Sequence, residues 1–421
     1  MSGSLPGLAR AADRGIPILL ILLLVALMTS ITAVDVLTAL LVVASLARLA
    51  DPAMRVRHRF PLAPPLLAFA AVTLLSAALS RDRAVAFFEA KHLLTLVLFF
   101  IAVNGFESSR HIRRALTWFF AAVAVVSIYA MLQSWACGTS GDLPAWLEWA
   151  LKLRLERCRR DLFRAKGFFS IYMTLGGSLL VGLAILLAGI VLGPRDRGLR
   201  LAPPAALALV ALGLTYVRNA WLGLCVVVAV LAFLARRLVL IMGLIVAVVI
   251  ALALPSVVRS KLTSIVDPSS DSARERLYLW DAGLRMVTDA PLLGLGPGGV
   301  RLHYPEYKHP DALKPRTSHL HNNLVQIAAE RGLLGLIAWL WIWGAFILTA
   351  GRIYRNLPPT RGDDRALVAG SLAAVVGFLI AGLFEYNFGD SEVIGLVLVV
   401  MAFPFVVGPL EAANPLAPNE A

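Results

Sequence analysis

Long apolar runs separated by short polar segments follow one another along the whole chain. A helix needs about 20 apolar residues to cross a bilayer. The run 201–235 is too long for one crossing, so we expect two helices there, with a sharp turn at Arg218-Asn219. The pattern predicts twelve transmembrane helices, at roughly 15–32, 34–50, 61–80, 90–106, 114–134, 171–193, 200–217, 219–235, 238–255, 333–351, 366–385 and 391–409.

The composition supports the same class of protein. Of the 421 residues, 59% are hydrophobic and only 15% are charged, whereas a soluble domain is about 45–50% apolar and about 25% charged. The mean hydropathy is +0.79. These values exclude soluble enzymes, secreted domains and disordered regulators. They predict an all-α polytopic membrane protein in which residues 1–421 form a single integral membrane domain.

The basic residues predict how the helices are oriented. Six alternate connecting segments hold 18 of the 39 lysines and arginines, and the positive-inside rule assigns such segments to the cytoplasm. Both termini are then cytoplasmic. Residues 135–170 and 256–332 become two long loops on the outer face of the membrane.

These two outer loops carry 17 further basic residues, which sidedness alone does not explain. Arginine outnumbers lysine by 33 to 6, and a planar guanidinium holds phosphate oxygens at two points. The excess indicates an anionic partner at the outer face. Contact with anionic lipid headgroups is the alternative for the run 152–160. Cys137 and Cys158 share the first loop, so they form either a bridge, as an oxidising compartment permits, or two unpaired thiols.

The second outer loop contains most of the candidate chemistry. Its stretch 274–301 predicts a helix with Arg276, Trp280 and Leu284 on one stripe, followed by Pro291 and a glycine-rich turn. Such a turn can cradle phosphate with backbone N–H groups. No Walker lysine or strand–turn–helix context accompanies it, so a plain loop is the favoured interpretation.

Two histidines follow in the stretch RTSHLHNN. Thr317 or Ser318 is expected to cap a helix that has His319 and His321 in its first turn. A histidine at the outer face is a reasonable general base, because its ordinary pKa lies near working pH. A capping or loop histidine is the simpler interpretation of either one alone.

Arg218 is the other unusual residue, because it interrupts an otherwise apolar hairpin. An ionisable residue at such a place is costly and suggests a function, while snorkelling to lipid headgroups is the alternative. Metal chemistry is not expected. There is no D-x-D motif, and His303, His309, His319 and His321 lack an HExxH or cysteine context.

The same residues resemble the bacterial O-antigen ligase/polymerase superfamily, most closely its O-antigen ligase (WaaL) family. The likeness covers about residues 60–390 and rests on four motifs in order. The first is R-x-x-G-x-F, at Arg164 to Phe169, and the second is an arginine that opens a middle span, at Val217-Arg218-Asn219-Ala220-Trp221, with valine in place of the usual serine. The third is R-x-x-x-W before P-x-x-G-x-G, at Arg276 to Trp280 and Pro291 to Gly296. The fourth is H-[NSQ]-x9-G-x-x-G, at His321-Asn322 and Gly332 to Gly335.

The resemblance implies a GT-C-like membrane fold and a reaction at the periplasmic face of a Gram-negative inner membrane. Such ligases transfer a glycan from undecaprenyl pyrophosphate to a sugar hydroxyl of lipid A–core, with inversion and without a metal or other cofactor. The loops 135–170 and 256–332 would then be periplasmic, and the second would contain the active-site elements. Membrane lipids are further expected partners, and nucleic acid is not.

The chemistry of the residues fits this reaction. The donor's leaving group is a pyrophosphate, whose growing charge needs cations in the absence of a metal. Arg218 and Arg276 are the first candidates for that role, and His321 is the candidate base for the acceptor hydroxyl. The supporting candidates for substrate binding are Arg164, Arg274, Arg285, His319, Asn322 and Trp280.

Three other functions remain open at this point. An O-antigen polymerase (Wzy-like) would carry R-x10-G motifs on both outer loops, and only Arg285 with Gly296 satisfies that spacing. A protein O-oligosaccharyltransferase would use a protein hydroxyl as acceptor, and those relatives are typically longer at the C-terminal end. A lipid-linked glycan transporter would show internal repeats and charges at mid-membrane, which the sequence does not display.

Overall fold

A computed structural model describes residues 5–55, 58–138, 144–151, 163–236 and 271–408. Every regular element in this part of the chain is a helix, and nine are long and apolar enough to cross a membrane. The predicted all-α polytopic class is therefore confirmed. The nine are α1 (Leu5–Thr29), α2 (Ile31–Ala50), the run α5 (Arg83–Ala90), η1 (Lys91–Leu96) and α6 (Val97–Gly105), α7 (Ser109–Gly138), α10 (Tyr172–Leu192), α11 (Arg195–Thr215), α12 (Arg218–Ala235), α17 (Asn323–Asn356) and α18 (Gly362–Ala381).

Two further segments are shorter apolar helices, and they occupy predicted spans as well. They are α4 (Ala63–Leu79) and the pair α19 (Ser391–Met401) and α20 (Phe403–Val407). The remaining elements are short or polar: α3 (Pro52–Arg55), α8 (Ala145–Ala150), α15 (Asp271–Asp289), α16 (Gly299–Tyr307) and η2 (Asn387–Gly389). Eleven of the twelve predicted segments thus contain helices, and the predicted span 238–255 lies outside the described residues. Cys158 also lies outside them, so whether it is bridged to Cys137 falls outside the described residues.

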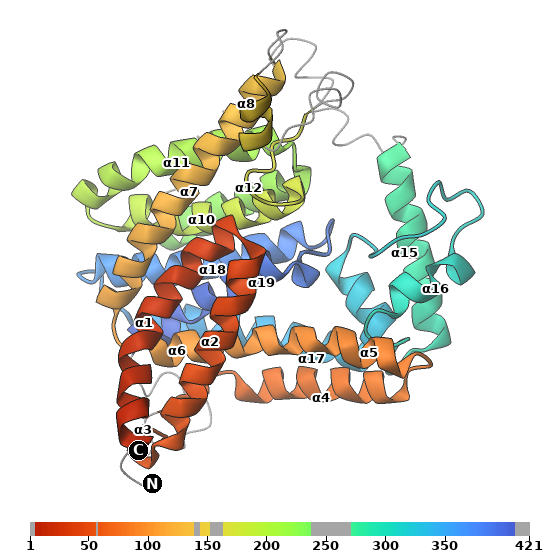
Figure 1. Cartoon of the computed structure of the whole chain (residues 1–421), viewed down its shortest axis with the longest axis horizontal. Helices are drawn as coiled ribbons and strands as arrows, with labels where there is room; N and C mark the ends of the chain where they lie inside the picture. Colours follow the sequence, from red (N-terminus) through yellow and green to blue (C-terminus); the bar gives the residue numbers. More distant parts are fainter. Residues whose placement is uncertain (1–4, 56–57, 139–143, 152–162, 237–270, 409–421) are drawn as a thin grey trace.

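The centre of the bundle is the pair α10 and α18, whose apolar windows are 72% and 78% buried inside the protein. Small residues let these helices and α12 approach closely. A Cβ atom on Gly223 of α12 would come within 2.8 Å of the carbonyl oxygen of Gly377 on α18. By contrast, only 11% of the α2 window is buried, and its apolar side chains face outward, as those of a lipid-facing helix do. In Figure 1, α1 and α2 form one hairpin of the bundle, and α15 and α16 stand to the right of it.

The turn between α11 and α12 lies slightly earlier than predicted. Tyr216 adopts the left-handed conformation with φ of 52°, and Val217 precedes the first turn of α12. The hydroxyl of Thr215 accepts a hydrogen bond from the Val217 N–H, and the Trp221 indole N–H donates to the carbonyl of Leu212. These bonds complete the turn before Arg218, which is therefore the first residue of α12 and not part of the turn.

Helix α17 is broken at Gly332, which has φ of 66° and ψ of −174°. The break leaves backbone groups of α17 without helical partners, and the turn that follows α15 supplies them. The N–H groups of Leu295 and Gly296 donate to the carbonyls of Ala329 and Glu330, both at 2.9 Å. In return, the N–H of residue 333 donates to the carbonyl of residue 291 at 2.8 Å. Because unpaired backbone groups are costly inside a membrane protein, the turn and the break stabilise each other.

Both partners of this contact need glycine. A Cβ atom on Gly332 would lie 2.2 Å from the carbonyl group of Leu292, and one on Gly294 would lie 2.4 Å from the carbonyl carbon of Glu330. Both glycines also have positive φ angles, which L-residues adopt only at a cost. One glycine of each motif, Gly294 and Gly332, is therefore explained by a single backbone-to-backbone contact.

We predict that Gly332→Ala lowers the free energy of unfolding by about 2–4 kcal/mol, because strain at positive φ adds to the clash with the turn. Gly344→Ala is the matched control, since a Cβ atom there meets nothing within 4 Å and alanine favours the helix. Thermal unfolding of the two purified variants in the same detergent measures the difference. Equal stability of the two variants would contradict the interlocked arrangement.

Candidate active site

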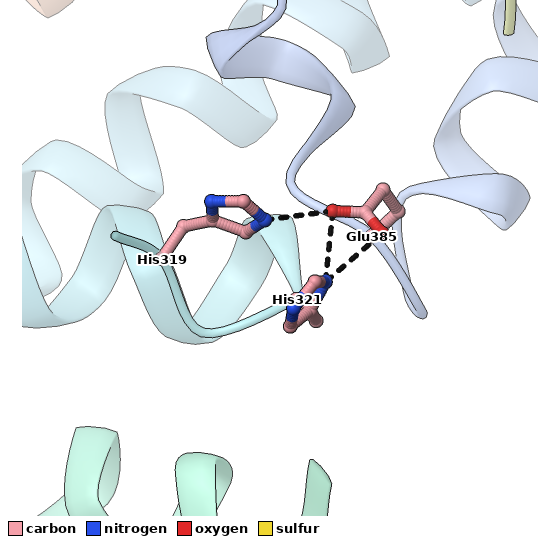
Figure 2. A group of neighbouring side chains, drawn as sticks. All are labelled: His319, His321 and Glu385. Carbon is pink, nitrogen blue, oxygen red and sulfur yellow. Dashed lines mark hydrogen bonds and ion pairs between the residues drawn. The ribbon is translucent and has the colours of Figure 1, made fainter. Parts of the chain in front are cut away.

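Two histidines and one carboxylate form a compact cluster between the start of α17 and the loop after α18. Nδ1 of His321 lies 3.0 and 2.9 Å from the two carboxylate oxygens of Glu385. Nε2 of His319 lies 3.0 Å from one of them. Figure 2 shows the two imidazoles on the segment before α17 and the carboxylate reaching them from the loop after α18. Sequence reasoning missed Glu385, which stands at the C-terminal end of the predicted span 366–385.

The histidines precede α17 instead of lying in its first turn. Asn322 is the N-cap, and its side-chain oxygen accepts from the N–H of Val325. The predicted caps Thr317 and Ser318 therefore do not cap this helix. Because Asn322 takes that position, His321 is held just outside the helix with a left-handed φ of 51°, a conformation that is uncommon for a non-glycine residue and is often found at functional sites.

The loop that carries Glu385 is fixed to the start of α17 by amide pairs. The side chain of Asn322 donates to the carbonyl of Leu383 at 2.9 Å, and that of Asn323 donates to the side-chain oxygen of Asn387 at 2.7 Å. The N–H of Asn323 also donates to the carbonyl of Gly382 at 2.8 Å. Asn322 thus positions both partners of the cluster, and its binding of substrate stays a prediction.

Glu385 is buried, with 9% of its side chain exposed. Burial alone would raise the pKa of this carboxyl, but the hydrogen bonds and charges of His319 and His321 outweigh burial and hold the pKa at about 2. The carboxylate is therefore ionised at neutral pH. It faces Nδ1 of His321, which places the proton of a neutral imidazole on that nitrogen and leaves Nε2 as the basic atom.

A cavity of about 350 Å³ lies beside the cluster, and His319 and Glu385 line it, while His321 does not. Arg331 also lines it, although only 6% of this residue is exposed. Its Nη1 donates to Glu330 at 3.0 Å, and its Nε has no hydrogen-bond partner among the described residues. Arg331 was not singled out from the sequence. The feature that could have indicated it is the Glu-Arg pair at the edge of an apolar run. The guanidinium thus places a positive charge beside the cavity.

The predicted arginines separate into two groups. Arg218, Arg276 and Arg164 lie close enough for the charges of the latter two to act on Arg218. Arg218 also stands at the N-terminus of α12, where the helix dipole disfavours a cation. An arrangement of like charges at this end of a helix is stabilised by an anion. By contrast, Arg285 forms an exposed ion pair with Asp281 at 2.7 Å.

The other residues of α15 complete the picture. Trp280 lies beside Phe384, with ring centroids 6.3 Å apart, so α15 reaches the loop that carries the Glu385 carboxylate. Arg274 is exposed. Leu284, predicted to share a stripe with Arg276 and Trp280, is 58% exposed. The buried stripe is instead formed by Leu279, Ala282 and Met286.

The glycine-rich turn is a structural loop, as its sequence context indicated. Its N–H groups at residues 294, 295, 296 and 299 donate to backbone carbonyls, and that of Gly298 donates to the side chain of Glu330. These groups are consequently not available to cradle a phosphate. The arginines remain the candidates for an anionic group.

Comparison with known proteins supports the family likeness. The O-antigen ligase family model matches residues 203–340. Proteins provisionally named polysaccharide ligase are similar over a shorter stretch. One from Rickettsia bellii is 28% identical over 123 residues, which is 28% of either chain. One from Rickettsia conorii is 27% identical over 127 residues, which is 28% of this chain and 27% of the relative. The matched stretch thus spans little more than a quarter of these relatives. Over residues 203–340, which include Arg218, Arg276 and His321, the predicted resemblance to the O-antigen ligase superfamily is confirmed.

Proposed function

We propose that this protein is an O-antigen ligase of a Gram-negative inner membrane. It transfers glycan from undecaprenyl pyrophosphate to a sugar hydroxyl of lipid A–core at the periplasmic face. The observation that carries the proposal is the Glu385–His321 pair in a bundle that also gathers three arginines. A neutral acceptor hydroxyl needs a base, and an anionic leaving group needs cations. The family match over residues 203–340 supports the same reaction class.

On the acceptor side, His321 removes the hydroxyl proton through Nε2. The carboxylate of Glu385 holds Nδ1–H and stabilises the imidazolium that forms, which is how a carboxylate assists a histidine base. The oxygen then attacks the anomeric carbon directly, so the configuration inverts. His319 shares the same carboxylate and lines the cavity, and it binds substrate there.

On the donor side, the bond between the anomeric carbon and the pyrophosphate oxygen breaks as the new bond forms. The charge on the departing oxygen is stabilised by Arg218 and Arg276, with Arg164 beside them. Preorganised cations in a partly dry site contribute most when charge develops in the transition state. Arg274 and Arg285 are more exposed and bind the outer parts of the substrates.

His319, His321 and Glu385 are also the one group among the described residues that could hold a metal ion, since their ligand atoms lie within 4.8 Å of one another. Two imidazoles and a carboxylate are a ligand set that zinc accepts. In our proposal, the carboxylate orients the base instead. The two assignments differ in whether a chelator stops the reaction.

We predict that the purified chain, given undecaprenyl-pyrophosphate-linked glycan and lipid A–core in EDTA, attaches glycan to lipid A–core. Loss of transfer in EDTA, with recovery on adding zinc, would replace the oriented base by a metal site. Longer glycan on the lipid carrier would indicate a polymerase, glycan on a protein hydroxyl would indicate an oligosaccharyltransferase, and intact donor moved across a vesicle membrane would indicate a transporter.

The matched variants for this assay are His321→Ala and His309→Ala. His309 lies on the same segment and stacks on Tyr278 at 4.4 Å, away from the cluster. Loss of the base lowers the transfer rate by about 10²–10⁴-fold, so we expect that loss for His321→Ala only, with both variants still in the membrane. Full activity of His321→Ala would contradict the base assignment.

We also predict a pH signature for Glu385→Gln, which keeps the side-chain size and removes the charge. Because the pKa of Glu385 is lowered from 4.5 to about 2 in the folded protein, its carboxylate contributes stability that is present above the ordinary pKa and lost as the pH falls from 4.5 towards 2. The difference in unfolding free energy between wild type and variant should shrink over that range. Thermal unfolding at a series of pH values measures this difference. If the difference has already vanished at pH 5, the lowered pKa is contradicted.

A further inference from the structure

A second cavity, of about 590 Å³, lies among α7, α10, α11 and α18. It shares no lining residue with the cavity beside the histidines. Its lining combines several arginines with an apolar wall. The charged members are Arg110, Arg113, Arg114, Arg197, Arg200, Asp196 and Asp363.

The two cavities lie at opposite ends of α18. Asp363, near the start of this helix, lines the second cavity, and Ala381, its last residue, lines the first. A helix of 20 residues is about 30 Å long, close to the thickness of the hydrocarbon core of a bilayer. The second cavity is thus at the opposite membrane face from the histidine cluster, where the positive-inside rule places the cytoplasm.

Acidic residues balance only part of the positive charge. Arg197 pairs with Asp363 at 2.6 Å. Arg113 lies 3.5 Å from Asp364, but that carboxylate also contacts Arg361 at 2.7 Å. The positive charge of one of these two arginines is therefore only weakly balanced.

The remaining pairs leave more charge uncompensated. Arg200 is 3.9 Å from Asp196, and both side chains are more than 70% exposed, so that pair contributes little. Arg110 and Arg114 are exposed and form no ion pair within the described residues. The rim of the cavity consequently offers at least two guanidinium groups to an anion.

The rest of the cavity is apolar. Its apolar lining residues include Leu116 and Phe120 of α7, Ile185 of α10, Leu201 of α11 and Leu367 of α18. A free phosphate would use only the rim. A ligand with a phosphate head and an acyl chain would use both parts, because each part matches one end of such a molecule.

We propose that this cavity binds an anionic phospholipid of the cytoplasmic leaflet, with its phosphate at Arg110 and Arg114 and an acyl chain along the apolar wall. The positive-inside rule explains why arginines are on this face, but it does not require them to rim a cavity between four helices. The site is separate from the proposed transfer reaction and does not depend on it.

The test compares lipids that remain on the purified full chain in native mass spectrometry. Phosphatidylglycerol and zwitterionic phosphatidylcholine with the same acyl chains are supplied in equal amounts. Wild type should retain phosphatidylglycerol selectively. Arg110→Gln together with Arg114→Gln should lower that retention on the order of tenfold, since each basic residue near the surface contributes appreciably to anionic lipid binding.

Two further variants make the result specific. Arg352→Gln with Arg355→Gln removes the same charge from exposed positions at the end of α17, outside the cavity, and should leave retention unchanged. Ala124→Phe fills part of the apolar wall and should lower retention without removing any charge. Equal retention in all variants, equal binding of both lipids, or displacement by undecaprenyl phosphate in preference to phosphatidylglycerol would overturn the proposal.

Discussion

The contact between the break in α17 and the turn at 291–296 determines where the two halves of the site lie. Backbone groups released by Gly332 need partners within the protein, and the turn supplies them through the N–H groups of Leu295 and Gly296. The turn directly follows α15, so the same contact sets the position of Arg276 relative to His321, which precedes α17. A local backbone requirement thereby relates the cationic group to the candidate base.

A single buried carboxylate relates the two imidazoles of the histidine cluster to each other. Glu385 faces both imidazoles, and their hydrogen bonds and charges keep it ionised despite its burial. Its loop is fixed by the amide pair of Asn323 and Asn387, so the carboxylate is positioned independently of substrate. Preorganisation of this kind means that the base need not be reoriented during the reaction.

The sequence predicted the spans well, because long apolar runs leave little choice of structure in a membrane. It also singled out His321 and Arg218 individually. It could not predict the break at Gly332, since a glycine within an apolar run is compatible with a continuous helix. Glu385 was missed because its partner His321 lies 64 residues away in the chain, and an acidic residue at the end of the predicted span 366–385 resembles an ordinary helix boundary.

The proposed reaction separates two roles: arginines hold the pyrophosphate, while the carboxylate and histidine act on the acceptor. Inhibition of transfer by undecaprenyl pyrophosphate, the proposed product, distinguishes the two roles. We predict that Arg276→Gln raises the inhibition constant at least about tenfold, as loss of a charge-assisted contact would. Glu385→Gln should slow transfer but leave this constant unchanged. An unchanged inhibition constant in Arg276→Gln, or an equal rise in both variants, would contradict this separation of roles.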